Sequence, residues 1–251
     1  MTTAVQASLQ AMGPLLRPHC IIRAGTASYM QEAVSQHIIP HRLRILRRSA
    51  TRGELRSTGF GAVQIVYTRY DADVLLEPDP VDDCYLFDVP LSGCSWIRGQ
   101  RSELPITAGL TGITSVGQSV SYLQESDTEL VTVKVGRGAL ESQLARQLGA
   151  TPPRPLRFEA SVALADTGGG RAWLTALETV CRQLHDSGGP LRNGWLCAET
   201  ERWLLALLLH GLPHNYSTAL PGAGSRQALP HYVASAERFI TDNDDDTIST
   251  G

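Results

Sequence analysis

The chain has 251 residues, of which 42% are hydrophobic and 19% charged, and its net charge at pH 7 is −3. This length can bury a sizeable core, in one large domain or in one domain with an appendage. The slightly acidic balance argues against a nucleic-acid-binding surface, because such surfaces are usually basic, and no stretch is apolar for long enough to predict a membrane span.

The first part of the chain divides into an arm and a β-rich region. Residues 1–36 are mixed in character, and we interpret them as an N-terminal arm with a short helix over residues 29–36. Residues 37–160 contain short runs of β-branched and aromatic side chains, separated by glycine-containing turns. The predicted strands lie at residues 63–70, 85–91, 95–98, 112–116, 120–123 and 129–135. Many short strands predict a barrel or a sandwich, and a barrel commonly encloses a small-molecule cavity.

The spacing of apolar residues becomes helical at the end of this region. It predicts a helix over residues 138–149 and, within residues 161–218, a hairpin of two amphipathic helices. The apolar stripe of the first hairpin helix consists of Trp173, Leu174, Leu177, Val180, Cys181 and Leu184. The candidate dimer interface is the stripe of the second helix, at Leu196, Trp203, Leu204 and Leu207. This stripe is the candidate because an apolar stripe ahead of a linker favours self-association.

The last residues predict a linker and then the start of another module. Residues 219–229 contain the glycine, proline and serine that are typical of a flexible linker. In residues 230–251, a proline precedes apolar residues at helical spacing, and an acidic turn follows. An amphipathic helix needs a surface to pack on, and the sequence supplies none downstream. We therefore expect residues 230–251 to begin a domain that this chain does not complete.

No arrangement of residues predicts catalysis or a bound metal. The sequence has no His-x-His pair that would place two imidazoles on one strand face, so no metal site and no cofactor are predicted. The triple glycine at residues 168–170 lacks the lysine and the spacing of a phosphate-binding loop, and we interpret it as a loose turn. The five cysteines show no paired spacing and no secretion signal is apparent, which favours reduced thiols in a cytoplasm. We predict that the chain is not an enzyme.

Candidate ligand-binding residues come from a basic run and from aromatic residues in the predicted strands. Arg42 and Arg44 share one strand face, so they could point into a barrel and bind a ligand carboxylate; the alternative is an exposed strand face. The aromatic residues of the predicted strands are Tyr67, Tyr70, Tyr85, Phe87, Trp96 and Tyr122. The predicted ligand-binding residues are Arg42, Arg44, Tyr67, Tyr85, Phe87 and Trp96. The alternative for the rings is that they fill the core, since the inward face cannot be assigned without the strand register.

A series of short motifs runs in order along most of the chain. Pro-x-Tyr-Val-x-x-Ala-Glu-x-Phe-Ile occupies residues 230–240, and earlier motifs occupy residues 41–45, 86–93, 140–149 and 155–158. The first of these resembles the opening helix of the DNA-binding domain of AraC/XylS-type transcription regulators, and the others resemble the effector-binding half of that family. The resemblance implies an α+β fold: a cupin-like β-barrel, then a helical hairpin for dimerisation, and then the first helix of an incomplete helix-turn-helix domain.

The resemblance also implies a function. It predicts the ligand-sensing, dimerising half of a transcription regulator, with a small-molecule effector and a second copy of the chain as partners. Several members of the XylS branch sense aromatic acids or related aromatic metabolites, which is compatible with an arginine clamp. DNA would be bound only through the missing C-terminal domain, and no membrane partner is expected. Two alternatives remain, a protein-interaction module that senses nothing and a cupin-type enzyme, and the missing metal ligands argue against the enzyme.

Overall fold

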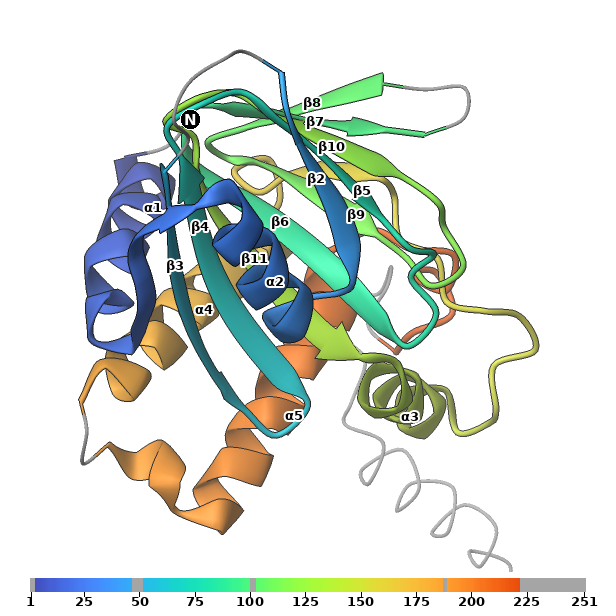
Figure 1. Cartoon of the computed structure of the whole chain (residues 1–251). Helices are drawn as coiled ribbons and strands as arrows, with labels where there is room; N and C mark the ends of the chain where they lie inside the picture. Colours follow the sequence, from blue (N-terminus) through green and yellow to red (C-terminus); the bar gives the residue numbers. More distant parts are fainter. Residues whose placement is uncertain (1–2, 47–51, 100–102, 187–188, 222–251) are drawn as a thin grey trace, which may run out of the picture.

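A curled antiparallel sheet organises the structure (Figure 1). The computed structural model describes residues 3–46, 52–99, 103–186 and 189–221, and within them it contains twelve strands and five α-helices. The strands are β1 (Cys20–Thr26), β2 (His41–Ile45), β3 (Arg52–Phe60), β4 (Val63–Tyr70), β5 (Val74–Pro78), β6 (Cys84–Ser92), β7 (Cys94–Arg98), β8 (Glu103–Thr107), β9 (Leu110–Thr114), β10 (Ser121–Gln124), β11 (Glu129–Gly136) and β12 (Ser161–Ala163). The helices are α1 (Thr3–Leu15), α2 (Ala27–His37), α3 (Arg137–Leu148), α4 (Gly168–His185) and α5 (Gly194–Gly211), with short 3-10 turns η1 (Arg17–His19) and η2 (Pro190–Arg192).

The order of the strands explains the position of α2. Paired neighbours follow the order β1-β3-β4-β11-β6-β9-β8-β7-β10-β5-β2, and β12 pairs with β9. Strands β1 and β2 are consecutive in the chain, yet they lie at opposite ends of this order. The helix that connects them, α2, therefore crosses the opening between the two edges of the curl (Figure 1). Its buried residues Met30, Ala33 and Val34 pack against Leu55 and Val66 of the sheet.

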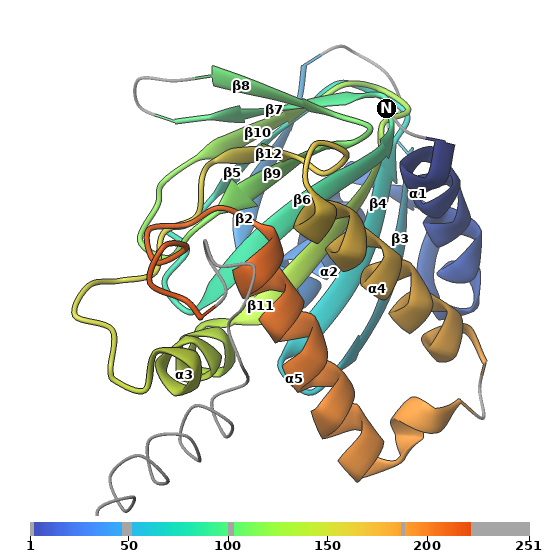
Figure 2. The same cartoon turned by 180° about the vertical axis from the view of Figure 1, so that it is seen from behind.

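The central strands β4, β6 and β11 are buried on both faces. On β6, Tyr85 and Phe87 belong to the core on the outer face, whereas Leu86 and Asp88 point into the curl. The outer face is covered by α1, α4 and α5, as seen from behind in Figure 2. The ring of Trp173 on α4 lies 6.0 Å from the ring of Phe87, measured between centroids. The largest core thus lies between the sheet and the helices, outside the curl.

Helices α4 and α5 form the expected hairpin and touch at a glycine pair. The Thr167 hydroxyl caps α4 by accepting a 2.9 Å hydrogen bond from the backbone N–H of Gly170. A Cβ atom on Gly169 would lie 2.5 Å from the Cα atom of Gly211, so the start of α4 contacts the end of α5 through backbone alone. The prediction of a loose turn at residues 168–170 is corrected: these glycines form the first turn of a helix and permit this close contact.

The cupin-like α+β fold predicted from the sequence is confirmed, with differences at the ends of the chain. The helix predicted over residues 138–149 is α3, and Gly149 follows it in the left-handed region with φ 69°. Residues 20–36, predicted to be part of an arm, supply strand β1 to the sheet and nearly all of helix α2, which covers it. The predicted linker beyond residue 221 and the predicted start of a second domain at residues 230–251 lie outside the described residues.

Candidate functional site

A small cavity lies inside the curl, between the concave face of the sheet and α2. Its volume is about 50 Å³, and its walls include Leu86, Leu130 and Thr132 from the central strands. Val34 of α2 and Ile38, the residue that follows α2, line it from the other side. An apolar cavity that accepts benzene measures about 150 Å³. A ligand of that size would therefore require the cavity wall to move, and α2 is the one wall that crosses the open side of the curl.

The cavity contains a cluster of unsatisfied polar atoms. His41 Nε2, the Tyr70 hydroxyl and Asp88 Oδ2 are buried, line this cavity and have no hydrogen-bond partner among the described residues. Buried polar atoms in proteins are nearly always hydrogen-bonded, so each exception needs an explanation. The other such atoms of the described residues do not line this cavity. The clustering of three in one place marks the cavity as the candidate site.

Asp88 is the charged group of this site. Its side chain belongs to a residue that is 3% exposed, and its Oδ1 accepts a 2.6 Å hydrogen bond from the Thr132 hydroxyl on β11. Burial raises the pKa of Asp88 to about 6, and the hydrogen bond from Thr132 acts in the opposite direction. At neutral pH the carboxylate is therefore mostly ionised. Its second oxygen, Oδ2, is left without a partner from the described part of the chain.

The other polar residues of the site are held in defined positions. His41 Nδ1 lies 3.1 Å from the backbone carbonyl oxygen of Ile39 and 3.1 Å from the Ser35 hydroxyl oxygen, and burial lowers the pKa of His41, which favours the neutral imidazole. A neutral ring that donates from Nδ1 keeps Nε2 as an acceptor. Across the curl, the Tyr122 hydroxyl lies 2.6 Å from Thr114 Oγ1. Burial raises the pKa of Tyr122, which keeps its phenol protonated. The site thus combines a carboxylate with neutral polar groups.

The two arginines predicted to bind a ligand lie elsewhere. Arg42 and Arg44 are exposed on β2, and Arg44 Nη1 lies 4.0 Å from Glu77 Oε2 at the surface. Neither residue lines the cavity. Alternation along β2 gives the reason: His41 lines the cavity and Leu43 is partly buried, so the residues between and beyond them point to solvent. Both arginines therefore lie on an exposed strand face, which was the alternative to ligand binding for this basic run.

The four predicted aromatic residues also lie outside the cavity. Tyr67, Tyr85 and Phe87 belong to the core under the helices, on the outer face of the sheet. Trp96 is partly exposed on β7, where its Nε1 lies 3.5 Å from Glu125 Oε1. Of the six predicted ligand-binding residues, none lines the cavity, so the structure does not bring them together there.

The residues that do line the cavity were visible in the sequence only in part. Tyr70 and Tyr122 were among the strand aromatics, but they were not selected as ligand-binding residues. Asp88 is the one charged residue in the run Cys84–Ser92, which is otherwise rich in apolar side chains. A lone carboxylate in a strand that is buried on both faces is a usable signal, because such a group needs a partner or a function.

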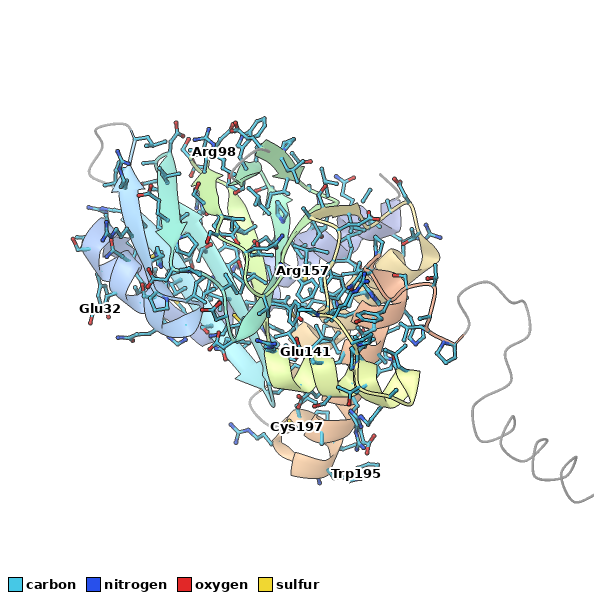
Figure 3. The ribbon with its side chains drawn as sticks, turned by 90° about the vertical axis from the view of Figure 1, so that its right-hand side faces the viewer. Glu32, Arg98, Glu141, Arg157, Trp195 and Cys197 are labelled. Atoms are coloured by element: carbon cyan, nitrogen blue, oxygen red, sulfur yellow. The ribbon has the colours of Figure 1, made fainter. Side chains whose placement is uncertain are left out.

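The predicted dimer interface on α5 is partly exposed and partly buried. Leu196 is 37% exposed and Trp203 is 47% exposed, whereas Leu204 is fully buried against the main core. Leu207 is partly buried against the same core. Trp195, which the sequence analysis did not select, is 68% exposed. It lies near the start of α5, at the tip of the molecule farthest from β7 and β8 (Figure 3). The exposed apolar surface of α5 therefore consists of Trp195, Leu196 and Trp203.

Neither a metal centre nor a second pocket among the described residues competes with the cavity under α2. No three His, Cys, Asp or Glu side chains in the described ranges are arranged to hold a metal ion. None of the described helices is long and apolar enough to cross a membrane. A depression of about 370 Å³ near Ile97, Leu104 and Val120 is larger than the cavity under α2. No described side chain that lines this depression carries a buried polar atom without a partner, so it does not compete as a candidate site.

Comparison with known proteins agrees with this architecture. The AraC-binding-like domain family matches residues 30–210, which is more than half of the chain. The probable thc operon regulatory protein of Rhodococcus erythropolis is 24% identical over 235 residues, which cover 86% of this chain and 70% of that protein. The crystal structure of the AraC-like transcriptional activator CuxR aligns with a TM-score of 0.52 at 14% identity, covering 91% of this chain and 81% of CuxR.

A putative ethanolamine utilization protein from Salmonella typhimurium aligns over a smaller region, with 34% of this chain and 69% of that protein covered, 13% identity and a TM-score of 0.29.

The family match spans β2 to β11 and continues through α3, α4 and most of α5. It thus includes most of the sheet and both helices of the hairpin. The chain belongs to the AraC-binding-like domain family of AraC-type regulators.

Proposed function

We propose that this chain is the ligand-sensing and dimerising part of an AraC-type transcription regulator, and that its effector binds in the cavity under α2. The observation that carries the proposal is the cluster of unpartnered polar atoms on His41, Tyr70 and Asp88 in that cavity. A pocket with mostly apolar walls and a few convergent polar groups is the usual form of a small-molecule site. In this proposal the chain has no catalytic role, and DNA is bound by a further domain.

A physical connection runs from the cavity to the helical hairpin. Helix α2 follows β1 directly, and β1 follows α1 and η1, so a displacement of α2 acts on the segment that leads to α1. This segment is tied to the end of α4, because His19 Nε2 lies 2.8 Å from the Leu184 carbonyl oxygen and His185 Nδ1 lies 2.8 Å from the Leu15 carbonyl oxygen. A ligand shifts this arrangement only by its difference in affinity for the two positions of α2.

The surface proposed for dimerisation is the exposed apolar part of α5. Trp195, Leu196 and Trp203 are spaced so that they lie along one side of the helix. Tryptophan is among the residues most enriched where protein interfaces are strongest. We propose that a second copy of the chain covers these residues. Leu204 is excluded from the proposed interface because it is already buried in the core.

The experiment that tests sensing is a thermal-shift screen of the chain against a broad small-molecule library, with a matched pair of variants. Leu76 lines the cavity, whereas Leu75, its neighbour on β5, does not. A ligand that binds the folded state raises the melting temperature in proportion to the logarithm of its concentration once it is in excess. We expect Leu76→Trp to fill the cavity and abolish the shift, and Leu75→Trp to retain it.

Two results would contradict the proposal. One is a library in which no compound raises the melting temperature of the wild-type chain. The other is a ligand that shifts Leu76→Trp and the wild type equally, because such a ligand binds outside the cavity.

A further inference from the structure

The chemistry of the cavity wall indicates which class of effector it suits, provided that the proposed sensing function holds. Asp88 is the acidic residue of this wall. Its carboxylate is held on one side by the Thr132 hydroxyl, and Oδ2 has no partner among the described residues. A buried carboxylate is stabilised by a nearby cation or by several hydrogen-bond donors, and one donor leaves it undersupplied.

The basic residue on the same face of β11 as Thr132 does not supply a cation to Asp88. Lys134 is on the concave face of β11, two residues from Thr132, but its Nζ donates a 2.6 Å hydrogen bond to the Ile38 carbonyl oxygen. Arg42 and Arg44 are exposed on the other side of β2. No lysine or arginine in the described ranges lines the cavity, so no positive charge of its wall faces Asp88.

A second acceptor lies in the same cavity. His41 Nδ1 lies 3.1 Å from both the Ile39 carbonyl oxygen and the Ser35 hydroxyl oxygen. A carbonyl oxygen can only accept, so the neutral ring carries its proton on Nδ1 and leaves Nε2 as an acceptor. The Tyr70 hydroxyl is also without a partner in the described structure, and it can accept or donate. The cavity thus offers a negative charge and a neutral acceptor, and the described residues of its wall supply no fixed positive charge.

We propose that the effector is a small amine, whose protonated nitrogen pairs with Asp88 Oδ2 and donates a second hydrogen bond to His41 Nε2. Its carbon skeleton packs against Leu86 and Leu130, which form part of the apolar wall. A carboxylic acid, the class that an arginine clamp would have suited, is disfavoured because its charge would face that of Asp88. The cavity of about 50 Å³ admits a short skeleton, and a bulkier one displaces α2.

Calorimetric titration with matched probes tests this inference. The probes are butylamine, butanol and butyrate, and then benzylamine, benzyl alcohol and benzoate, so that only the polar group changes within each series. The variants are Asp88→Asn, which removes the charge at nearly constant shape, and Glu159→Gln, which removes an exposed acidic charge that does not line the cavity. We expect an amine to bind the wild type more tightly than its alcohol and its acid. We expect Asp88→Asn to weaken amine binding by more than about tenfold and Glu159→Gln to leave it unchanged.

The outcomes separate this inference from the sensing function on which it rests. Binding of an alcohol or an acid in preference to the amine, with loss of binding in Leu76→Trp, would overturn the amine assignment and support sensing. Equal binding of an amine by the wild type and Asp88→Asn would also overturn it, as would the absence of binding by all six probes. Sensing itself is then decided by the library screen. Should Asp88→Asn fail to fold, Asp88→Thr removes the same charge and His41→Gln tests the second acceptor.

Discussion

Thr132 on β11 lies directly opposite Asp88 on β6, and its hydroxyl donates a 2.6 Å hydrogen bond to Asp88 Oδ1. This pairing places a carboxylate in the interior of the curl with one oxygen satisfied and the other without a described partner. A polar pair of this kind is costly in a buried strand, since desolvation of the charge outweighs one hydrogen bond. The pair gives the cavity a carboxylate with a free acceptor oxygen, which the apolar residues around it do not provide.

Replacement of Asp88 by asparagine should stabilise the unliganded chain at neutral pH. The pKa of Asp88 in the folded state is about 6, above its ordinary value of 3.8. Between these pH values the folded chain retains a proton that the unfolded chain releases, so the wild type loses stability as pH rises through this window. Above this pH window the loss in the free energy of unfolding is complete and amounts to about 3 kcal/mol.

Urea unfolding of the wild type and Asp88→Asn between about pH 4 and about pH 7 measures this effect. The advantage of the variant should grow with pH across this range and then level off. Glu159→Gln, at an exposed position, serves as the control and should show no such trend. A constant difference between Asp88→Asn and the wild type at all pH values would contradict the assignment of a raised pKa to Asp88.

Replacement of Gly169 by alanine should destabilise the chain, whereas the same change at Gly168 should not. The new Cβ atom at Gly169 would lie 2.5 Å from the Gly211 Cα atom, and this contact is with backbone that cannot rotate away. At Gly168 the nearest atom would be Arg171 Nη2, at 3.9 Å. We expect a loss of about 1–3 kcal/mol for Gly169→Ala, measured by urea unfolding. Equal stabilities of the two variants would show that the helices can separate at no cost.

Arg56 should be sensitive to replacement by lysine, although both side chains are cationic. Its guanidinium is buried, pairs with Glu54 at 2.8 Å, lies 4.1 Å from the centre of the Tyr67 ring and donates to the carbonyl oxygen of Gly13 in α1. Lysine cannot reproduce this planar, forked arrangement. We expect Arg56→Lys to lower the free energy of unfolding by about 1–3 kcal/mol.

Arg69 provides a matched control for this change. It pairs with Asp127 at 2.5 Å, but both side chains are largely exposed, at 45% and 62%. Exposed ion pairs contribute about 0–1 kcal/mol, so Arg69→Lys should change stability little. If differential scanning calorimetry gave equal losses for the two variants, the buried contacts of Arg56 would not be what stabilises the attachment of α1.

Two adjacent residues of α5 should respond in different ways. Trp203 is 47% exposed and belongs to the proposed dimer surface, so Trp203→Glu should convert a dimer to monomers without changing the unfolding midpoint of the monomer. Leu204 is fully buried, so Leu204→Ala should lower stability by about 2–5 kcal/mol through loss of core packing. Sedimentation velocity and urea unfolding separate the two effects. A wild-type chain that sediments as a monomer, or a Trp203→Glu variant that remains dimeric, would argue against this surface.

Much of the secondary structure was predictable because it depends on neighbours along the chain. The run at residues 63–70 became β4 with the same bounds, and the helical spacing after residue 137 became α3, ended by Gly149. Strand β1 was missed because residues 20–26 look like part of a mixed arm until β3 is beside them. The first turn of α4 was missed because glycine is a weak helix former, and its position there is justified only by contact with Gly211.

The residues that line the cavity were harder to predict, because the sequence does not show which face of a strand lies inside the curl. Alternation along β6 shows that Phe87 and Asp88 face opposite sides, but it does not say which side faces a cavity. The outer face became the main core because α1, α4 and α5, from both ends of the chain, pack on it. On β2 none of the described helices covers the outer face, so alternation leaves Arg42 in solvent while His41 lines the cavity.

The α+β class, several of the strands, the helical hairpin and the likeness to AraC-type regulators could be read from the sequence, because periodicity and short motifs are local properties of the chain. The position of the cavity, in contrast, follows from the tertiary structure. Strands β1 and β2 end up at opposite edges of the sheet, and α2 spans the opening between them to enclose a cavity on the concave face. That arrangement depends on pairings between residues far apart in sequence, and it is these pairings that place Asp88 and His41 in one cavity.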